Sequence, residues 1–150
     1  MKKKAIIAIA ALCMVMACAY ADAKSDALIE AAKNNDTAEV ARLIQAGADL
    51  NATDDYGKTA LMRAAYRNAV DAARLLIESG ADVNAKDDHG LTALMAAAAD
   101  NAADTAKLLI QAGADMNTRE NMYDMTALMI AKERDAKDVI ALLKAAGAKE

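Results

Sequence analysis

An internal repeat of 33 residues constrains this chain more than any other feature of its sequence. Two phrases recur at this period and always in the same order. The first reads GADLNA, GADVNA and GADMNT, and the second reads TALMRAA, TALMAAA and TALMIAK; they begin at Gly47, Gly80 and Gly113 and at Thr59, Thr92 and Thr126. A period of this length indicates stacked copies of one small structural unit, each copy burying the face of its neighbour.

The residues of one repeat predict two short helices followed by a turn-rich loop. Thr59 is placed to accept a hydrogen bond from the first-turn N–H groups of a helix. Asn68 stands between the two helices and Gly80 ends the second, because Asn and Gly tolerate the left-handed conformation that such breaks require. The loop tips at 54–57 and 87–90 combine Asp with Gly, which is turn chemistry. The unit is therefore helix, turn, helix and hairpin.

Composition agrees with a helical stack. The chain is 56% hydrophobic, 41 of its 150 residues are alanine, and it has no Pro, Phe or Trp. The β-branched and aromatic excess of an all-β domain is missing. We expect an all-α repeat solenoid whose helices approach closely on small side chains.

The repeat resembles the ankyrin repeat, whose pattern is D-x-x-G-x-T-P-L-H-x-A-A, a second helix, and then G-A-D-V-N. The resemblance covers residues 24–150 as one repeat domain, with about four units at 25–54, 55–87, 88–120 and 121–150. This chain departs from the pattern where Ala replaces the usual Pro and Met replaces the usual His; these positions are Ala60, Ala93 and Ala127, and Met62, Met95 and Met129.

The fourth repeat carries charge where the earlier repeats are apolar. Lys132 stands where Ala65 and Ala98 stand, and Lys144 stands where the earlier repeats have isoleucine. A terminal repeat has no following neighbour to cover this face. We therefore expect both lysines to be exposed.

Residues 1–23 read as a secretory signal peptide. Three lysines at 2–4 precede an uncharged apolar stretch at 5–17, and Ala-x-Ala cleavage patterns end at Ala21 and Ala23. We expect Ser25 to cap the first helix of the mature chain. Residues 15–18 resemble a lipidation motif, so a lipid anchor on Cys18 is the alternative to soluble export into the periplasm or medium.

Cleavage would leave an acidic chain without cysteine. The whole chain has a net charge of −4, with 18 basic and 22 acidic residues and two cysteines, Cys13 and Cys18. Loss of three lysines leaves 15 basic residues against 22 acidic ones after a cut at Ala21, or against 21 after a cut at Ala23. Disulfides and thiol chemistry are then excluded, and the acidic balance argues against nucleic acid and anionic membranes. We expect a monomer that is not inserted in the membrane.

No constellation of catalytic or metal-binding residues is recognisable, so we expect no enzyme and no cofactor. His89 is the single histidine, and it has no Ser or Cys partner and no second His. The Asp pairs at 54–55 and 87–88 lack the spacing of a calcium loop and read as solvated turns. Met122, Met125 and Met129 raise a copper(I) alternative, but Met129 occupies a repeating helix position that reads as core. A metal carrier or an enzyme is a remote alternative.

The fourth hairpin is irregular. It is one residue longer than its counterparts, and Asp124 stands where Gly57 and Gly90 stand. Drift in a terminal repeat explains this, or else a specialised loop that exposes Met122, Tyr123 and Met125 to a partner.

The ankyrin resemblance implies a protein-binding module whose hairpin tips and inner helices form one concave binding face. Tyr56, Tyr66, Arg67 and Tyr123 are the expected anchors, since Tyr and Arg dominate many interfaces. The resemblance places the following residues on that face: Asp55, Tyr56, Lys58, Arg63, Tyr66, Arg67, Asp88, His89, Leu91, Asp100, Asn101, Asn121, Met122, Tyr123, Met125, Glu133 and Arg134. The expected partner is another protein, which the sequence does not identify.

Overall fold

The chain is described here from a computed structural model, which covers the backbone of residues 2–149 and the side chains of 13–17, 19, 20 and 22–149. Within this part of the chain eight helices follow one another. They are α1 (Lys2–Lys33), α2 (Thr37–Gln45), α3 (Ala60–Tyr66), α4 (Val70–Glu78), α5 (Ala93–Ala99), α6 (Ala103–Gln111), α7 (Ala127–Glu133) and α8 (Lys137–Ala145).

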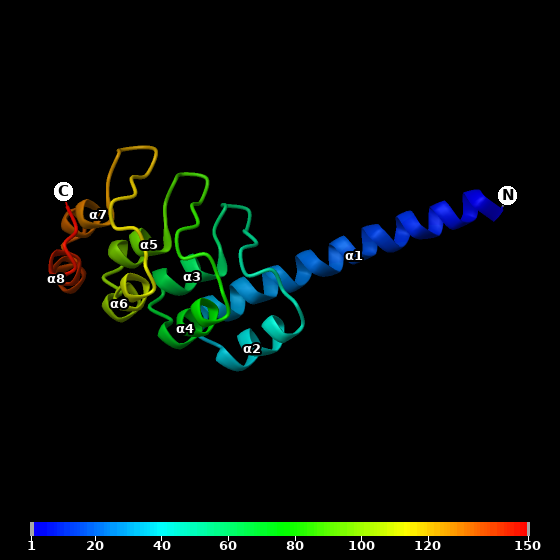
Figure 1. Cartoon of the computed structure of the whole chain (residues 1–150), viewed down its shortest axis with the longest axis horizontal. Coiled ribbons are helices and arrows are strands. Elements are labelled where there is room, and N and C mark those ends of the chain that lie inside the picture. The colour runs from blue at the N-terminus through cyan, green and yellow to red at the C-terminus, as the bar shows by residue number, and fades with distance from the viewer. Residues whose placement is uncertain (1, 150) are drawn as a thin grey trace.

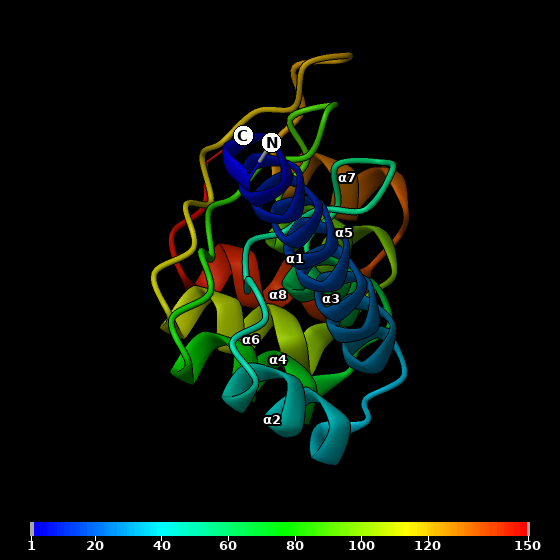
Figure 2. The ribbon, with the colours of Figure 1, turned by 90° about the vertical axis from the view of Figure 1, so that its right-hand side faces the viewer.

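The helices form two layers and the loops between repeats project to one side (Figure 1). The C-terminal part of α1 packs on α3, and α5 and α7 continue this inner layer, while α2, α4, α6 and α8 form the outer layer. Seen along the stack, all three long loops rise on the same side of the helices (Figure 2). This arrangement confirms the all-α solenoid of about four units.

The expected caps and turns form where the sequence places them. Thr59 accepts a hydrogen bond from the Met62 N–H at the start of α3. Asn68, between the helices of its repeat, has a φ of +52°, and Gly80, after α4, has a φ of +97°. Both angles lie in the left-handed region that Asn and Gly adopt at low cost.

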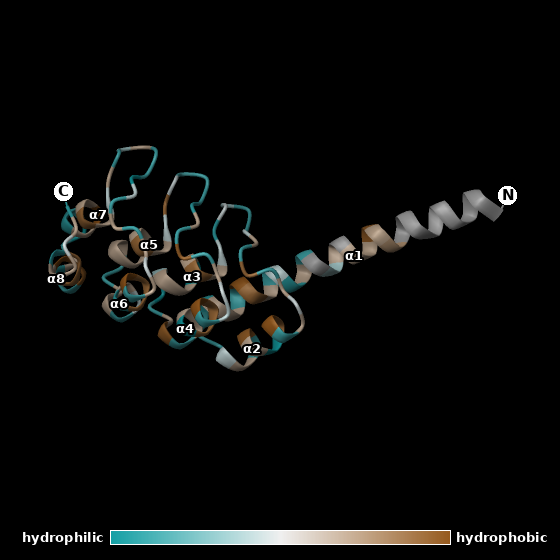
Figure 3. Cartoon of the chain, viewed as in Figure 1, coloured by the Kyte–Doolittle hydropathy of each residue, from teal (hydrophilic) through white to brown (hydrophobic). Residues whose placement is uncertain are grey.

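The core is a ladder of leucines separated by alanines. Leu61, Leu94 and Leu128 are each 1% exposed, and Ala65 and Ala98 are fully buried. Small residues let adjacent helices approach closely, which is how this chain packs without large rings. Apolar residues gather on the helices and polar residues on the projecting loops (Figure 3).

The terminal face of the fourth repeat has the expected charge. Lys132 and Lys144 are both exposed, whereas Ala65 and Ala98 are covered by the repeat that follows. Met129 is half-buried, although Met62 and Met95 at the same position are 2% and 1% exposed. The expectation that all three methionines are core residues therefore holds only where a further repeat packs on them.

Three outer helices receive their N-terminal cap from the preceding repeat. The N-cap residues of α4, α6 and α8 are alanines without a capping side chain. The side-chain oxygens of Asn35, Asn68 and Asn101 instead accept from third-position N–H groups in the next repeat, at 2.9, 3.2 and 3.3 Å, from Ala72, Thr105 and Val139. A cap of this kind is worth about 1 kcal/mol, so these asparagines stabilise the stack as well as the turns.

The first outer helix is capped within its own repeat. Asp36 accepts from the Glu39 N–H at 3.1 Å. No asparagine from a preceding repeat stands beside α2 among the described residues, and the aspartate satisfies the same helix terminus.

The expected cap at Ser25 is wrong. Ser25 lies inside the continuous helix α1 and is only 8% exposed. Neither Gly nor Pro occurs before Gly47, so nothing in the backbone ends a helix between the alanine-rich leader and the first repeat. Ser25 instead packs at the point where α1 joins the stack.

The N-terminal half of α1 projects beyond the repeats (Figure 1). Met14, Val15, Met16 and Tyr20 are 73%, 66%, 66% and 66% exposed. Among the described residues, no helix is both long enough and apolar enough to span a bilayer. The side chain of Cys18, the alternative lipidation site, lies outside the described residues.

Candidate functional site: a groove between the hairpins and the inner helices

A groove of about 1020 Å³ runs between the projecting loops and the inner helices of the last three repeats. Its apolar lining includes five methionines. The lining residues are Lys58, Met62, Arg63, Tyr66, His89, Leu91, Thr92, Met95, Ala96, Ala99, Glu120, Met122, Tyr123, Met125, Met129, Ile130, Lys132, Glu133 and Arg134.

An aspartate near the start of the tip organises each of the two shorter hairpins. In the Asp54 hairpin (47–59), one carboxylate oxygen accepts from the N–H groups of Tyr56 and Lys58 at 2.9 and 3.0 Å. In the Asp87 hairpin (80–92), Asp87 accepts from His89 and Leu91, both at 2.9 Å. The aspartates thus hold the turns that carry predicted site residues.

The Glu120 hairpin (113–126) reaches the same result with a longer side chain. The Glu120 carboxylate accepts from the N–H groups of Met122, Tyr123 and Met125 at 2.6, 2.7 and 3.2 Å. Asp124, at the position of the earlier glycines, has a φ of +55°. The glutamate has one more methylene than aspartate, and it spans a loop that has one more residue.

The aspartates of the shorter hairpins also pair with cations. The second oxygen of Asp87 accepts from the Lys58 ammonium at 2.7 Å, and Asp54 accepts from the Arg63 Nε at 2.8 Å. These pairs are half-buried, with side-chain exposures of 29% for Lys58 and 28% for Arg63. The two cations are thereby fixed along one wall of the groove.

The charged environment lowers the pKa values of these carboxyl groups. Burial by itself raises the pKa of Asp87, but the Lys58 ammonium and two backbone N–H groups lower it more. The same balance lowers the pKa of Asp54, with Arg63 as the cation. For Glu120, burial raises the pKa, and three backbone N–H groups, with a smaller contribution from His89, lower it below its usual value. The hairpins are therefore held by carboxylates that stay ionised.

Adjacent hairpins stack closely on one another. A Cβ atom added to Gly57 would lie 2.8 Å from the backbone nitrogen of Asp88. The Asn121 N–H donates to the carbonyl of His89 at 2.8 Å. The loops thus form one continuous wall, so the groove is preorganised over three repeats.

The structure brings ten of the sequence-predicted site residues together in the groove lining. Tyr66 is 49% exposed, Met122 61% and Tyr123 72%, while Met125 is half-buried. The ten residues are Lys58, Arg63, Tyr66, His89, Leu91, Met122, Tyr123, Met125, Glu133 and Arg134.

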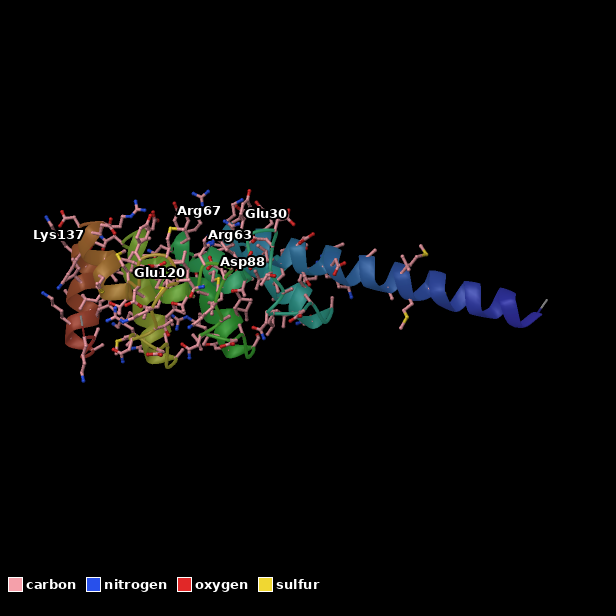
Figure 4. All side chains as sticks on the ribbon, turned by 90° about the horizontal axis from the view of Figure 1, so that it is seen from above. Glu30, Arg63, Arg67, Asp88, Glu120 and Lys137 are labelled. Carbon is pink, nitrogen blue, oxygen red and sulfur yellow. The ribbon has the colours of Figure 1, made fainter. Side chains whose placement is uncertain are left out.

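The exposed hairpin tips carry four predicted residues that lie outside this lining. Tyr56 is 66% exposed, and its ring lies 5.7 Å from the Arg63 guanidinium carbon. Asp55 and Asp88 are exposed on the tips, and Asp88 lies one repeat before Glu120 along the stack (Figure 4). Asn121, on the Glu120 hairpin, is also exposed.

The other three predicted residues outside the lining lie at the C-terminal ends of the inner helices. Arg67 and Asp100 are the C-terminal cap residues of α3 and α5, and both are exposed. The Asn101 amide instead links two repeats, donating to Asp138 at 3.0 Å and accepting from the Val139 N–H. Its side chain has a structural role in the stack.

Several lining residues were not predicted from the sequence, namely Met62, Thr92, Met95, Ala96, Ala99, Glu120, Met129, Ile130 and Lys132. The methionines were interpreted as core residues because they recur at a buried helix position. That recurrence carried a usable signal, since three methionines in register must form a row along the inner layer. The alanines carried no such signal, because Ala is common throughout the chain.

The groove combines apolar side chains with charged groups that are engaged within the hairpins. Within the described side chains, no cluster of three or more His, Cys, Asp or Glu residues is arranged to hold a metal ion. The Glu120 carboxylate accepts three backbone N–H groups and is committed to its own loop.

Comparison with known families agrees with the geometry. The family model for ankyrin repeats, in three copies, matches residues 7–87 and 85–149. A search of curated proteins finds no match to this chain. Ankyrin repeats are generally protein-binding modules and are typically non-enzymatic. The chain belongs to the ankyrin repeat family.

Proposed function

We propose that this chain is an exported, non-enzymatic module that binds another protein in the groove formed by its hairpins and inner helices. The observation that carries the proposal is the groove itself, with its apolar floor, exposed tyrosines and charged edges. An apolar centre inside a polar rim is the usual anatomy of a protein interface.

The side chains in the groove are of the types that dominate protein interfaces. Tyr66 on α3 and Tyr123 on the Glu120 hairpin present large, half-polar rings to the groove. The methionines adapt their shape to an apolar partner, because the thioether chain is unbranched and polarizable. Since the three loops are held by carboxylate–backbone hydrogen bonds, binding costs little ordering of the module.

Crosslinking in the native compartment tests this site. We expect replacement of Tyr66 and Tyr123 by Ala to lower crosslinking to the bound protein by about tenfold or more, since both rings are anchors. Tyr56→Ala tests whether the hairpin tip contributes, because Tyr56 lies outside the groove. Lys107→Ala, on the exposed face of α6, is the matched control. Unchanged crosslinking after loss of both groove tyrosines would refute the site.

Export is supported by the leader sequence and by where the packing of α1 begins. Asp22 and Ala23 are exposed, whereas Lys24 is half-buried and its ammonium donates to the carbonyl of Ala46 at 2.9 Å. A cut after Ala21 or Ala23 removes the projecting apolar segment and keeps this contact. The remaining helix is still longer than α3, α5 and α7.

Mass spectrometry of the mature protein tests export. A new N-terminus at Asp22 or Lys24 supports soluble export to the periplasm or medium. A diacylglyceryl group on Cys18 would instead support the lipid-anchored alternative, and an uncut chain would refute processing altogether. Stoichiometric copper or zinc in the purified protein would overturn the non-metal assignment.

A further inference from the structure

At the third repeat, two alanines line the groove at positions where the second and fourth repeats carry longer side chains. Two groove-lining positions of the inner helices recur in register, so each repeat contributes equivalent residues to the groove. These rows are Arg63, Ala96 and Ile130, and Tyr66, Ala99 and Glu133. Ala96 and Ala99 on α5 thus form a hollow between the larger side chains of α3 and α7.

The hollow has an apolar lining on the side of the loops. Leu91 and Met125 are half-buried and pack against the core, and Met122 projects from the tip of the Glu120 hairpin. Met95, in the first turn of α5, is buried. The hollow therefore offers an apolar lining to one large apolar side chain.

A row of charges runs beside the hollow at the C-terminal ends of the same helices. Arg67, Asp100 and Arg134 cap α3, α5 and α7. Neither arginine side chain has an ion-pair partner among the described residues. Arg67 lies at the edge of the stack (Figure 4). In a chain of net charge −4, these two guanidinium groups are cations with no ion-pair partner among the described residues, one on α3 and one on α7, the helices that flank α5.

The spacing of the two cations defines a ligand. Adjacent packed helices lie about 10 Å apart, so each guanidinium is displaced by about one helix spacing from the hollow on α5. A polyproline II segment rises about 3.1 Å per residue and repeats every three residues, so positions three apart share one face about 9 Å apart. An anchor with carboxylates three residues before and after it matches this arrangement.

Resting on the proposed protein-binding function, we infer that the groove binds an extended segment of a partner protein with the pattern acidic–x–x–anchor–x–x–acidic. The anchor is a large apolar side chain that enters the hollow at Ala96 and Ala99. The two carboxylates pair with Arg67 and Arg134, because guanidinium and carboxylate form short, charge-assisted hydrogen bonds. The segment runs along the stack, across α3, α5 and α7.

The first experiment fills the hollow with the chain's own residues. Ala96→Arg and Ala99→Tyr copy the side chains that repeat 2 carries at the same positions, so the helix and the stack tolerate them. The matched control is Ala141→Arg, which copies Arg74 onto the exposed outer face of α8. Circular dichroism and the thermal midpoint verify that the Ala96→Arg and Ala99→Tyr double variant and the Ala141→Arg control both fold.

The probe is a fluorescein-labelled peptide, Glu-Pro-Pro-Phe-Pro-Pro-Glu, titrated by anisotropy against the full-length chain. In this peptide two Pro residues separate Phe from each Glu. Three further peptides carry Ala in place of Phe, Lys in place of both Glu residues, or a single Pro between Phe and each Glu. A parallel series has Ser in place of every Pro. We expect the acidic Phe peptide to lose about tenfold or more in affinity with the Ala anchor and with the filled hollow, since each change removes the central contact. The Ala141→Arg chain should bind like the parent.

Charge reversal tests the two arginines. In the double variant Arg67→Glu and Arg134→Glu, the acidic peptide should bind more weakly and the Lys-flanked peptide more tightly than to the parent. Binding of the acidic peptide should also fall with added salt, because the paired groups are exposed. A peptide with single-residue spacers should bind more weakly than the parent peptide.

Three results would overturn the inference: no binding by any acidic peptide, equal binding of acidic and Lys-flanked peptides, or unchanged binding to the filled hollow. If the groove tyrosines still control crosslinking in such a case, the protein-binding function stands and only the ligand pattern fails. If the tyrosine variants also crosslink normally, the groove is not the binding site and both proposals fail.

Discussion

The Asp87 hairpin and the Glu120 hairpin are held in shape by the same kind of contact but with different residues. In each, one carboxylate accepts hydrogen bonds from backbone N–H groups of its own tip. The shorter loop uses Asp with Gly90 at the left-handed position, and the longer loop uses Glu with Asp124 at that position. Loop length and side-chain length therefore change together while the hydrogen-bond pattern is kept.

The two hairpins differ in how their carboxylate is paired. The Asp87 carboxylate accepts a hydrogen bond from the ammonium of Lys58 in the preceding hairpin. The residue equivalent to Lys58 in the hairpin before Glu120 is Leu91, which has no charge. The Asp87 hairpin is therefore tied to its neighbour by an ion pair. The Glu120 hairpin has an apolar neighbour instead, and it exposes Met122 and Tyr123 to the groove.

The largest expected difference between the hairpins is in stability. Asp87→Ala leaves the half-buried Lys58 ammonium unpaired and two backbone N–H groups without their acceptor, so we expect a loss of about 3 kcal/mol. Glu120→Ala should cost less, because among the described residues no ammonium pairs with Glu120. Urea unfolding followed by circular dichroism measures both, with the exposed Asp88→Ala as control. Equal losses for Asp87 and Glu120 would show that the ion pair adds nothing.

A second contrast concerns the left-handed residues Gly57 and Asp124. Gly57→Ala should destabilise the chain by about 2 kcal/mol, because φ is positive and the new Cβ would press on the backbone of Asp88. Asp124 tolerates a side chain at a similar φ, since no described hairpin stacks on it. Unfolding free energies of Gly57→Ala and Gly47→Ala separate the two causes, because Gly47 has open space around its Cβ position. Equal costs at both glycines would remove the stacking argument.

The pH dependence of stability should differ between Asp87 and an ordinary surface carboxyl. The folded pKa of Asp87 lies below its unfolded value, so its contribution is present above about pH 4. That contribution is lost as the pH falls through the unfolded and then the folded pKa. In Asp87→Asn the decline of stability on the acid side should therefore be shallower than in the parent. Thermal midpoints across this range, with Asp88→Asn as control, measure the slope, and an unchanged slope would contradict the ion pair.

The smallest expected effect is a gain in stability at the irregular loop. Asp124→Gly should raise the free energy of unfolding by about 0.5 to 1 kcal/mol, since Gly adopts a positive φ at no steric cost. The opposing loss is the contact of Arg119 with the Asp124 carboxylate, which is exposed and worth little. A decrease in stability would show that this surface ion pair contributes more than the positive φ of Asp124 costs.

Much of the fold followed from residue types and spacing. Thr59, Asn68 and Gly80 were placed correctly because each acts within a few residues of itself, through a cap or a left-handed angle. Ser25 was misplaced because the expectation set the leader aside, whereas the helix runs through it without a break. Ten of the residues predicted for the binding face line one groove, and their role in binding stays a prediction.

The sequence by itself determined the repeat unit, its caps and its left-handed turns, because these depend on neighbours a few residues away. The tertiary structure alone decided what crosses from one repeat to the next. Asn68 caps a helix 37 residues further along the chain, and Ala96 and Ala99 become a hollow only between the side chains of α3 and α7. The stacking distance between repeats brings these groups together, and no local pattern encodes that contact.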